Sequence, residues 1–236
     1  MDDTSDYDRT PLTPNRYAEG LKRNYSAHFF RWSFAQRFIK SYHDVLEVGC
    51  GADVPLARIL TGNQAPAVGS YYGVDLWPLP KTGNVRLTYR GEFNFVERWK
   101  EIKEKFDVVL SLEVIEHMKV HLGDELLRGC YELLRDDGVF ILSTPAYDGK
   151  KMAKNHIHEY YILEMQASLE KTGFKVCQRF GTYMDLRQVN KSDDPLIHEL
   201  RAKLETYFDN NAVSCIMAPF LPDLARNCLW VCEKEK

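Results

Sequence analysis

The sequence contains no paired cysteines, no long apolar run and no strong excess of charge of one sign, and each absence excludes a class of protein. Its 6 cysteines are scattered and none forms a C-x-x-C pair, which argues against a zinc ribbon or a disulfide framework. No apolar run approaches the about 20 residues that a membrane-spanning helix needs, and the acidic amino terminus MDDTSDYD is not that of a signal peptide. The net charge of -3 disfavours a protein that holds nucleic acid by its overall charge. We therefore predict a cytoplasmic protein with free thiols and without a membrane segment.

The chain of 236 residues, 44% of them hydrophobic and 28% charged, suits one folded domain with additions. Residues 1–14 are acidic and contain two prolines, which predicts a flexible lead-in. Residues 15–43 interleave cations with aromatic residues at near-helical spacing, so we expect a helical cap. This cap either packs an aromatic face on the core or forms a lid over a ligand. The remaining residues, 44–236, would form the main domain, with insertions on the substrate side near 145–158 and 182–222.

Strand and helix patterns alternate along the main domain. Apolar runs predict strands at residues 44–48, 71–75, 87–95, 106–110, 139–143, 174–180 and 227–233. Helical patterns and turn signals predict helices over residues 53–60, 123–135, 159–172 and 195–208. This alternation is typical of an α/β fold. We predict a Rossmann-like, seven-stranded and mostly parallel sheet with helices on both faces and an antiparallel closing strand.

A glycine-rich turn follows the first predicted strand in the segment VLEVGCG. Gly49 and Gly51 allow a tight turn and the close approach of a ligand, and Asp75 ends the next predicted strand. This layout binds a nucleoside, because the acid can accept hydrogen bonds from the ribose hydroxyls. Val54 stands where the dinucleotide fingerprint has its third glycine, which argues against a pyrophosphate. Glu47 likewise suits a cationic or amine-bearing ligand better than phosphates.

The segment FDVVLSLEVIEHM, residues 106–118, delivers two carboxylates and an imidazole to the carboxyl end of a central strand. If Glu113 opens a helix, Glu116 and His117 share one face with it. Such a set suits Mg, Mn, Fe(II) or Zn, and a further histidine ligand is available in the later segment NHIHEY. The alternative needs no metal: acids are favoured at a helix amino terminus, and His117 then acts as a general base or lines a wall. The sequence leaves both interpretations open.

Four segments together resemble the class I S-adenosylmethionine-dependent methyltransferases: VLEVGCG, YYGVD, FDVVLSLEVIEHM and LLRDDGVFILSTP. The resemblance covers most of residues 44–180 and implies S-adenosyl-L-methionine as the cofactor. It implies that the glycine turn lies near the amino-acid end of the cofactor and that Asp75 binds the ribose. The other cofactor-binding positions that it implies, besides Glu47, are Leu76 or Trp77 and then Glu92 and Phe93 near the adenine, and Ser111 and Leu112 near the methionyl part.

The E-x-x-E-H and H-x-H segments resemble two branches of this family. One branch comprises the ubiquinone-biosynthesis O-methyltransferases, which methylate a catechol. The other comprises the small-RNA 2′-O-methyltransferases, which hold a metal on the terminal ribose diol. The resemblance implies that His158, in preference to His156, completes a metal site with Glu113, Glu116 and His117, and that Glu116, His117 and His158 are catalytic. Ile157 replaces an acid of the RNA branch, which weakens the RNA assignment.

We therefore predict a methyltransferase acting on the hydroxyl of a small or nucleoside-like acceptor, with a divalent metal as an option. The alternatives are a nucleic-acid sugar methyltransferase and a non-catalytic cofactor-binding scaffold that regulates a partner. The sequence lacks N-P-P-[YF] and a Pro-Cys nucleophile, which disfavours base methylation, and it does not indicate the oligomeric state. The predicted acceptor side offers Arg16, Tyr17, Tyr25, Trp32, Tyr147, Lys150, Lys151 and Lys154.

Overall fold

A computed structural model describes residues 23–61, 68–150 and 152–235. The predicted lead-in of residues 1–14 lies outside them, as do Arg16, Tyr17 and Lys151. The helices are α1 (Arg23–Gln36), α2 (Pro55–Thr61), α3 (Phe95–Arg98), α4 (Val120–Leu133), α5 (Ile162–Thr172), α6 (Leu186–Val189), α7 (Pro195–Glu205) and α8 (Asn210–Met217). The strands are β1 (Asp44–Val48), β2 (Ser70–Val74), β3 (Leu87–Arg90), β4 (Phe106–Leu112), β5 (Leu134–Pro145), β6 (Phe174–Met184) and β7 (Ala225–Lys234).

The seven strands of the described residues form one sheet in the order β3-β2-β1-β4-β5-β7-β6. All neighbours from β3 to β5 are parallel, while β7 runs antiparallel to both β5 and β6. This arrangement confirms the predicted fold class. Because the strand order reverses between β1 and β4, their carboxyl ends flank the crevice in which sheets of this kind bind ligands.

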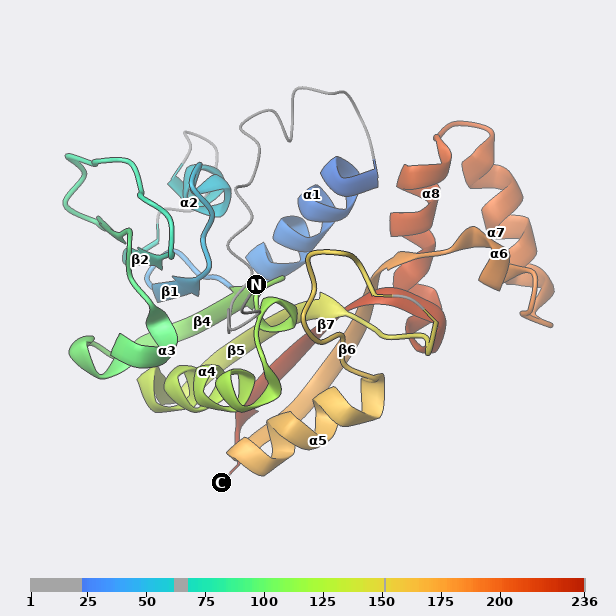
Figure 1. Cartoon of the computed structure of the whole chain (residues 1–236). Coiled ribbons are helices and arrows are strands. Elements are labelled where there is room, and N and C mark those ends of the chain that lie inside the picture. Colours follow the sequence, from blue (N-terminus) through green and yellow to red (C-terminus); the bar gives the residue numbers. More distant parts are fainter. Residues whose placement is uncertain (1–22, 62–67, 151, 236) are drawn as a thin grey trace.

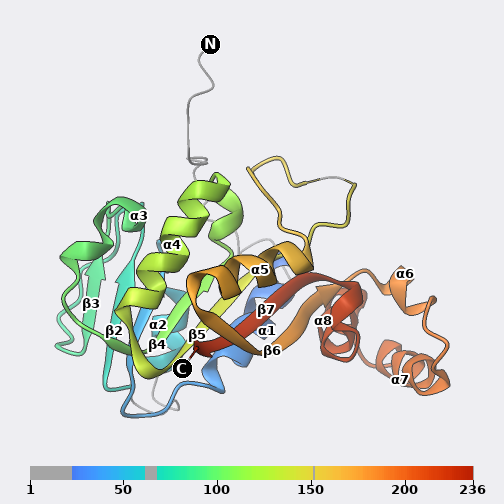
Figure 2. The ribbon, with the colours of Figure 1, turned by 90° about the horizontal axis from the view of Figure 1, so that it is seen from below.

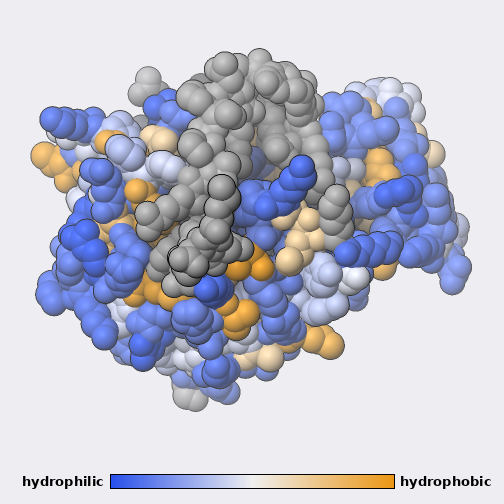
Figure 3. Space-filling model, in the orientation of Figure 1, coloured by the Kyte–Doolittle hydropathy of each residue, from blue (hydrophilic) through white to orange (hydrophobic). Residues whose placement is uncertain are grey.

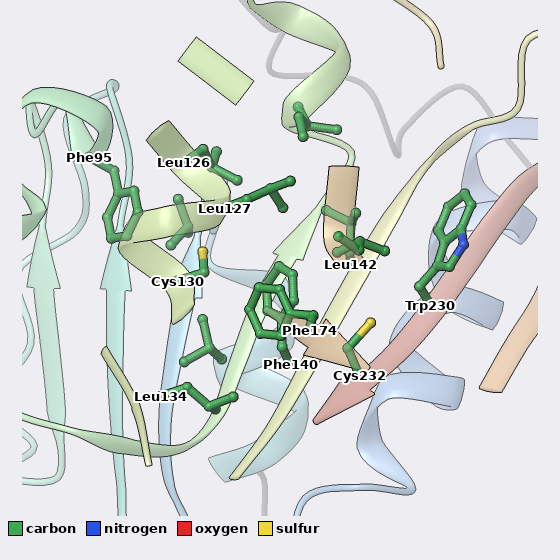
Figure 4. Packing of buried hydrophobic residues seen from close by; sticks show 14 of the residues in the cluster. Phe95, Leu126, Leu127, Cys130, Leu134, Phe140, Leu142, Phe174, Trp230 and Cys232 are labelled. Carbon is green, nitrogen blue, oxygen red and sulfur yellow. The ribbon is translucent and has the colours of Figure 1, made fainter. Parts of the chain in front are cut away.

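Helices cover both faces of the sheet because the central strands are apolar on both sides. In Figure 1 α1 and α2 lie above the sheet while α4 and α5 lie below it, and Figure 2 shows the latter pair in front of the strands. The core beneath α3, α4 and α5 is centred on Phe140, whose ring stacks on Phe174 with centroids 4.7 Å apart (Figure 4). A second core packs Trp32 and Ala35 of α1 and the apolar side of α2 against the other face.

The segment between β6 and β7 adds a third layer at one end of the sheet. Helices α6, α7 and α8 pack around Met184, Val213 and Met217, and α8 contacts both α1 and β6 (Figure 1). Asp194 and Asp209 begin α7 and α8 by accepting hydrogen bonds from the first free backbone N–H groups. These helices fall within residues 182–222, where we predicted a substrate-side insertion.

No helix begins at Glu113, so the condition under which Glu113, Glu116 and His117 would share one helical face is not met. Glu113 has a φ of +59°, a left-handed conformation that interrupts a right-handed helix. Only a single 3₁₀ turn, Ile115–His117, follows it, and α4 begins later, at Val120. The i, i+3, i+4 argument therefore does not apply to Glu113, Glu116 and His117.

Other boundaries differ by a few residues. We expected the helix over residues 123–135 to stop at residues 136–138, but α4 ends at Leu133 and those residues belong to β5. Pairing with β4 explains the early start of β5, because Phe106 lies opposite Leu134 across an irregular register.

No described helix is long and apolar enough to cross a membrane. The described residues on the face shown in Figure 3 are mostly hydrophilic.

Truncation of the central aromatic residue tests this core. Phe140 is fully buried, so Phe140→Ala should lower the free energy of unfolding by about 3–5 kcal/mol through lost burial and a cavity. Urea unfolding followed by circular dichroism measures the change. Val85→Ala is the control, because Val85 is 99% exposed and its truncation should change stability by less than about 0.5 kcal/mol. A loss below about 1 kcal/mol for Phe140→Ala would contradict the packing described here.

Candidate functional site

The glycine turn lies directly beside the segment that follows β4. Val48 is opposite Ser111 in the paired strands, and the N–H groups of Gly49 and Cys50 donate to the carbonyl of Val74 on β2. Gly49 has a φ of +76°, and a side chain there would collide with Val114. Glycine is therefore required both by the backbone conformation and by the neighbouring chain. The structure brings the two strongest sequence motifs together at one edge of the sheet.

Asp75 is held by two backbone N–H groups, one after β1 and one after β2. Its Oδ2 accepts from the Gly51 N–H at 2.8 Å and its Oδ1 from the Trp77 N–H at 3.0 Å. Burial raises the pKa of this carboxyl. The two N–H groups leave further lone pairs on the carboxylate, so it can still accept hydrogen bonds from a ligand.

The predicted adenine-side residues follow Asp75 and are joined to it through the backbone. The N–H of Phe93 donates to the carbonyl of Asp75, and the N–H of Glu92 donates to that of Trp77. Leu76 is 44% exposed, and Glu92 is exposed with a φ of +51°. The Phe93 side chain is instead buried, with the guanidinium groups of Arg90 and Arg98 at 4.2 and 4.7 Å from its ring centroid. The Phe93 ring therefore packs in the core and supports the loop that carries it.

Glu47 is a buried acid on β1 and is hydrogen-bonded to Tyr71, whose O–H donates to Oε2. Burial raises the pKa of Glu47 from 4.5 to about 8, although the Tyr71 hydrogen bond opposes this change. Cys50, in the glycine turn, is also buried, and burial raises the pKa of its thiol far above the ordinary range. Such a thiol is not a nucleophile at neutral pH.

Ser111 and Leu112 end β4 and are both buried. The Ser111 hydroxyl has no hydrogen-bond partner among the residues that the structure describes. An unpartnered buried hydroxyl is costly, and here it lies on the strand edge beside the glycine turn.

Glu113 is surrounded by protein donors. Arg31 of α1 forms an ion pair with its Oε1 at 2.6 Å, the Ser143 hydroxyl donates to Oε1 at 3.0 Å, and Asn227 Nδ2 donates to Oε2 at 2.8 Å. The Arg31 side chain is only 2% exposed. Glu113 was predicted as a metal ligand, but the structure commits its oxygens to α1, β5 and β7.

The sequence prediction missed Arg31, although a signal existed. Arg31, Ala35 and Ile39 are spaced by four residues and are all buried on one side of α1 and the turn that follows it. A cation in an otherwise apolar stripe needs a buried partner. That partner, Glu113, is distant in the sequence and so could not be identified without the fold.

Glu116, His117 and His156 form a cluster in which one potential ligand atom of each lies within 4.8 Å of the others. His117 Nε2 lies 3.9 Å from Glu116 Oε1, and the two imidazole rings are edge to face with centroids 5.0 Å apart. Glu116 is fully buried; Thr144 donates to its Oε2 at 3.2 Å, while Oε1 has no hydrogen-bond partner within the described ranges. Burial and then the Glu113 charge raise the pKa of Glu116 well above its ordinary value.

The predicted fourth ligand, His158, does not belong to this cluster. Its Nε2 contacts Glu164 Oε1 at 2.8 Å, and its ring lies edge-on to Tyr160. The backbone explains why His156, and not His158, joins the cluster. The N–H groups of Ile157 and His158 both donate to the carbonyl of Glu116. Anchored in this way, the loop places His156 beside His117 and His158 beside the start of α5.

The other residues that the sequence predicted for the acceptor side have different surroundings. Trp32 packs into the core and stacks on His28, and Tyr147 lies edge-on to Tyr161. Lys150 and Lys154 are exposed on the loop after β5. The Tyr25 side chain is outside the described part of the structure.

Comparison with known sequences gives a consistent family. Residues 17–179 match the family model described as a methyltransferase domain. A ubiquinone biosynthesis O-methyltransferase of Chelativorans sp. is 30% identical over 128 residues, 52% of this chain and 48% of that protein. Another, from Azorhizobium caulinodans, is 29% identical over 164 residues, 60% of this chain and 62% of that protein. The chain thus spans about half to three fifths of the length of these relatives.

Solved structures share the fold at low sequence identity. A SAM-dependent methyltransferase from Archaeoglobus fulgidus has a TM-score of 0.58 at 16% identity, covering 90% of this chain and 95% of its own. The N-methyltransferase NodS from Bradyrhizobium japonicum, in complex with S-adenosyl-L-homocysteine, has a TM-score of 0.58 at 12% identity, covering 89% of this chain and 88% of its own. With a domain match over most of its length, the chain belongs to the methyltransferase-domain family, and it has the fold of a solved SAM-dependent methyltransferase.

Proposed function

We propose that this enzyme methylates a hydroxyl group of a small molecule that carries two neighbouring hydroxyls, and that Glu116, His117 and His156 hold a divalent metal that binds the acceptor. The observation that carries the proposal is the convergence of these three side chains, with the buried Oε1 of Glu116 left without a hydrogen-bond partner among the described residues. The proposal adds a metal site to the O-methyltransferase activity that the sequence predicts. Its loop histidine is His156, whereas the sequence analysis named His158.

The three residues fit a metal because each offers it one ligand atom. A neutral imidazole can bind a metal through the ring nitrogen that carries no proton. His117 Nδ1 lies 2.8 Å from the carbonyl of Asn155, and His156 Nδ1 lies 2.7 Å from Glu159 Oε1, so both rings have an acceptor at Nδ1. The lone pair that a metal needs is then on Nε2 of each ring, and Glu116 Oε1 supplies the third ligand atom.

Two nitrogens and one oxygen favour a transition metal over magnesium. The predicted set of Glu113, Glu116, His117 and His158 contains two carboxylates, whereas the cluster in the structure contains one, Glu116. Mn²⁺, Fe²⁺ and Zn²⁺ accept imidazole ligands readily, and Mg²⁺ prefers oxygen. Three protein ligands leave coordination positions for both oxygens of a vicinal diol.

A bound metal would orient the acceptor hydroxyl and lower its pKa, which makes the oxygen a better nucleophile. The chain contributes the geometry. Gly49 and Gly51 would allow the cofactor to approach the backbone, and Asp75 would accept hydrogen bonds from its ribose. Glu47 would act at the amino-acid end of the cofactor, where a carboxylate favours an ammonium group. Ordering both reactants in this way replaces an encounter in solution by a preformed alignment of oxygen and methyl.

The relatives support an oxygen acceptor, because the proteins reported above are named ubiquinone biosynthesis O-methyltransferases. The 3′ end of an RNA, which also carries a diol, is less favoured by the local charge. Arg226 beside the loop is paired with Asp148, which leaves Lys150 and Lys154 as the exposed cations of the described part of residues 145–158. An RNA acceptor would bind with a steep dependence on salt.

Methyl transfer to matched acceptors tests the proposal. With labelled S-adenosylmethionine and Mn²⁺ or Zn²⁺, we expect methylation of catechol and little of phenol, which lacks the second hydroxyl. An RNA oligonucleotide with a free terminal ribose diol should be a poor acceptor. Turnover that persists after exhaustive chelation would rule out an essential metal. Equal turnover of catechol and phenol would rule out diol recognition.

The choice between the two loop histidines gives a sharper prediction. His156→Ala should weaken metal binding by more than about 100-fold, because loss of a ligand exceeds the roughly 10–100-fold effect of losing an outer partner. His158→Ala should bind metal almost as wild type does, because His158 contacts Glu164 and Tyr160 outside the cluster. Isothermal titration calorimetry with Mn²⁺ or Zn²⁺ measures both variants. The reverse order of effects would restore the set predicted from the sequence.

The buried acid of β1 predicts a pH dependence of cofactor binding. In the free chain the pKa of Glu47 is about 8, so Glu47 carries a proton at lower pH. A bound ammonium group favours the ionised carboxylate, so binding releases this proton. Ionisation of Glu47 should therefore raise the affinity for S-adenosylmethionine by up to about tenfold per pH unit below pH 8.

Calorimetry at several pH values measures this profile, with Glu47→Gln as the reference. The cofactor's own α-amino group titrates at a pKa of roughly 8, so the ratio of wild-type to Glu47→Gln affinity isolates the contribution of Glu47. We expect this ratio to increase from about pH 6 to about pH 8. A ratio that stays constant would show that Glu47 does not interact with the cofactor.

A further inference from the structure

Glu159 is a buried carboxylate that contacts the cluster of Glu116, His117 and His156 but has no role in the proposed reaction. Glu159 is 3% exposed, and its Oε1 lies 2.7 Å from His156 Nδ1. The same oxygen accepts from the backbone N–H of Ala153 at 3.0 Å. Burial of a carboxylate without compensation is expensive, so its position requires an explanation.

Arg226 of β7 forms an ion pair with this carboxylate, whose Oε2 has no hydrogen-bond partner among the described residues. Its Nη2 lies 3.8 Å from Glu159 Oε2, and its Nη1 lies 3.1 Å from both Asp148 Oδ1 and the carbonyl of Ala146. The backbone joins the same parts, because the Ala146 N–H donates to the carbonyl of Arg226. The loop that carries His156 is thus attached to β7, the strand that lies between β5 and β6.

The contact with Glu159 determines which nitrogen of His156 carries the proton. A carboxylate only accepts hydrogen bonds, so the neutral ring must hold its proton on Nδ1 in order to donate to Glu159. The lone pair is then on Nε2, the nitrogen that can bind a metal. A neutral histidine in water prefers the opposite tautomer, with the proton on Nε2.

We propose that Glu159, anchored by Arg226, is a positioning residue that holds His156 in the Nδ1–H tautomer and orients its Nε2 toward Glu116 and His117. This inference rests on the metal site of the proposed function. It assigns a role in metal affinity to a residue that touches neither substrate nor cofactor. Outer partners of this kind change metal affinity by roughly 10–100-fold.

The same loop contains a matched control. His158 also contacts a carboxylate, Glu164, at 2.8 Å, but through Nε2, and the Glu164 side chain is 36% exposed. Glu164 Oε2 accepts from the Tyr161 N–H at the start of α5. Removing Glu164 therefore breaks a histidine–carboxylate pair and a helix cap without affecting the cluster.

Metal titration of three variants forms the first arm of the experiment. Calorimetry with Mn²⁺ or Zn²⁺ should show roughly 10–100-fold weaker binding for Glu159→Ala than for wild type. Glu159→Gln should retain most of the affinity, because its amide oxygen still accepts from Nδ1–H. Glu164→Ala should bind as wild type does. Wild-type affinity in Glu159→Ala, or a loss in Glu164→Ala as large as in Glu159→Ala, would overturn the inference.

The second arm needs neither metal nor turnover. Nitrogen-15 NMR of the metal-free chain, at a pH where the ring is neutral, reports the tautomer of His156. We expect Nδ1–H in wild type and Glu159→Gln, and a shift toward Nε2–H in Glu159→Ala. An Nε2–H tautomer of His156 in wild type would overturn the inference even if Glu159→Ala does not fold.

The two arms separate the two proposals. A wild-type chain that binds no metal contradicts the proposed function, while the NMR result still decides whether Glu159 controls His156. A wild-type chain that binds metal with an affinity independent of Glu159 retains the proposed function and refutes the positioning role.

Discussion

Two carboxylates at the carboxyl end of β4 have to be compensated below the protein surface, and this constraint connects the surrounding elements. Transfer of an ionised carboxylate out of water is costly unless charges or hydrogen bonds replace the solvent. Glu113 receives Arg31 from α1, Ser143 from β5 and Asn227 from β7. Glu116 receives a hydrogen bond from β5 and keeps one oxygen beside two imidazole rings. The ion pair that holds α1 against Glu113 and the contacts that position Glu116 therefore compensate the same pair of acids.

The left-handed backbone at Glu113 separates the roles of these two acids. A non-glycine residue at φ +59° costs about 1–3 kcal/mol, and such strain persists only where the surroundings enforce it. Here it directs Glu113 toward α1 and β7, while Glu116 and His117 turn toward the loop after β5. A regular helix from Glu113 would have placed all three side chains on one face, with Arg31 left as an unpaired buried cation.

The loop after β5 illustrates how backbone and side chains together distinguish one histidine from another. Two N–H groups of this loop bind the carbonyl of Glu116, and its stem is closed by the Tyr147 N–H, which donates to the carbonyl of Tyr160. His156 then contacts a buried carboxylate, whereas His158 contacts a more exposed one at the start of α5. In our proposal this contrast distinguishes a metal ligand from a residue that stabilises the start of a helix.

Local patterns determined the fold and the glycine turn: apolar runs specify buried strands, and Gly49, Gly51 and Asp75 specify the turn after β1 and the acid after β2, which the Gly51 N–H contacts in the structure. These features are encoded within short segments, so the sequence alone was sufficient to predict them. The partners of Glu113 and the choice of His156 over His158 depended on tertiary structure. Arg31, Asn227 and Arg226 are far from the site in sequence, and only the packing of α1 and the pairing of β7 with β5 bring them to it. Because the backbone of Glu113 is left-handed, its side chain does not lie with the metal ligands among which its sequence spacing had placed it. The sequence spacing of residues predicts the direction of their side chains only where the backbone is regular. At this edge of the sheet, burial and charge pairing override that regularity.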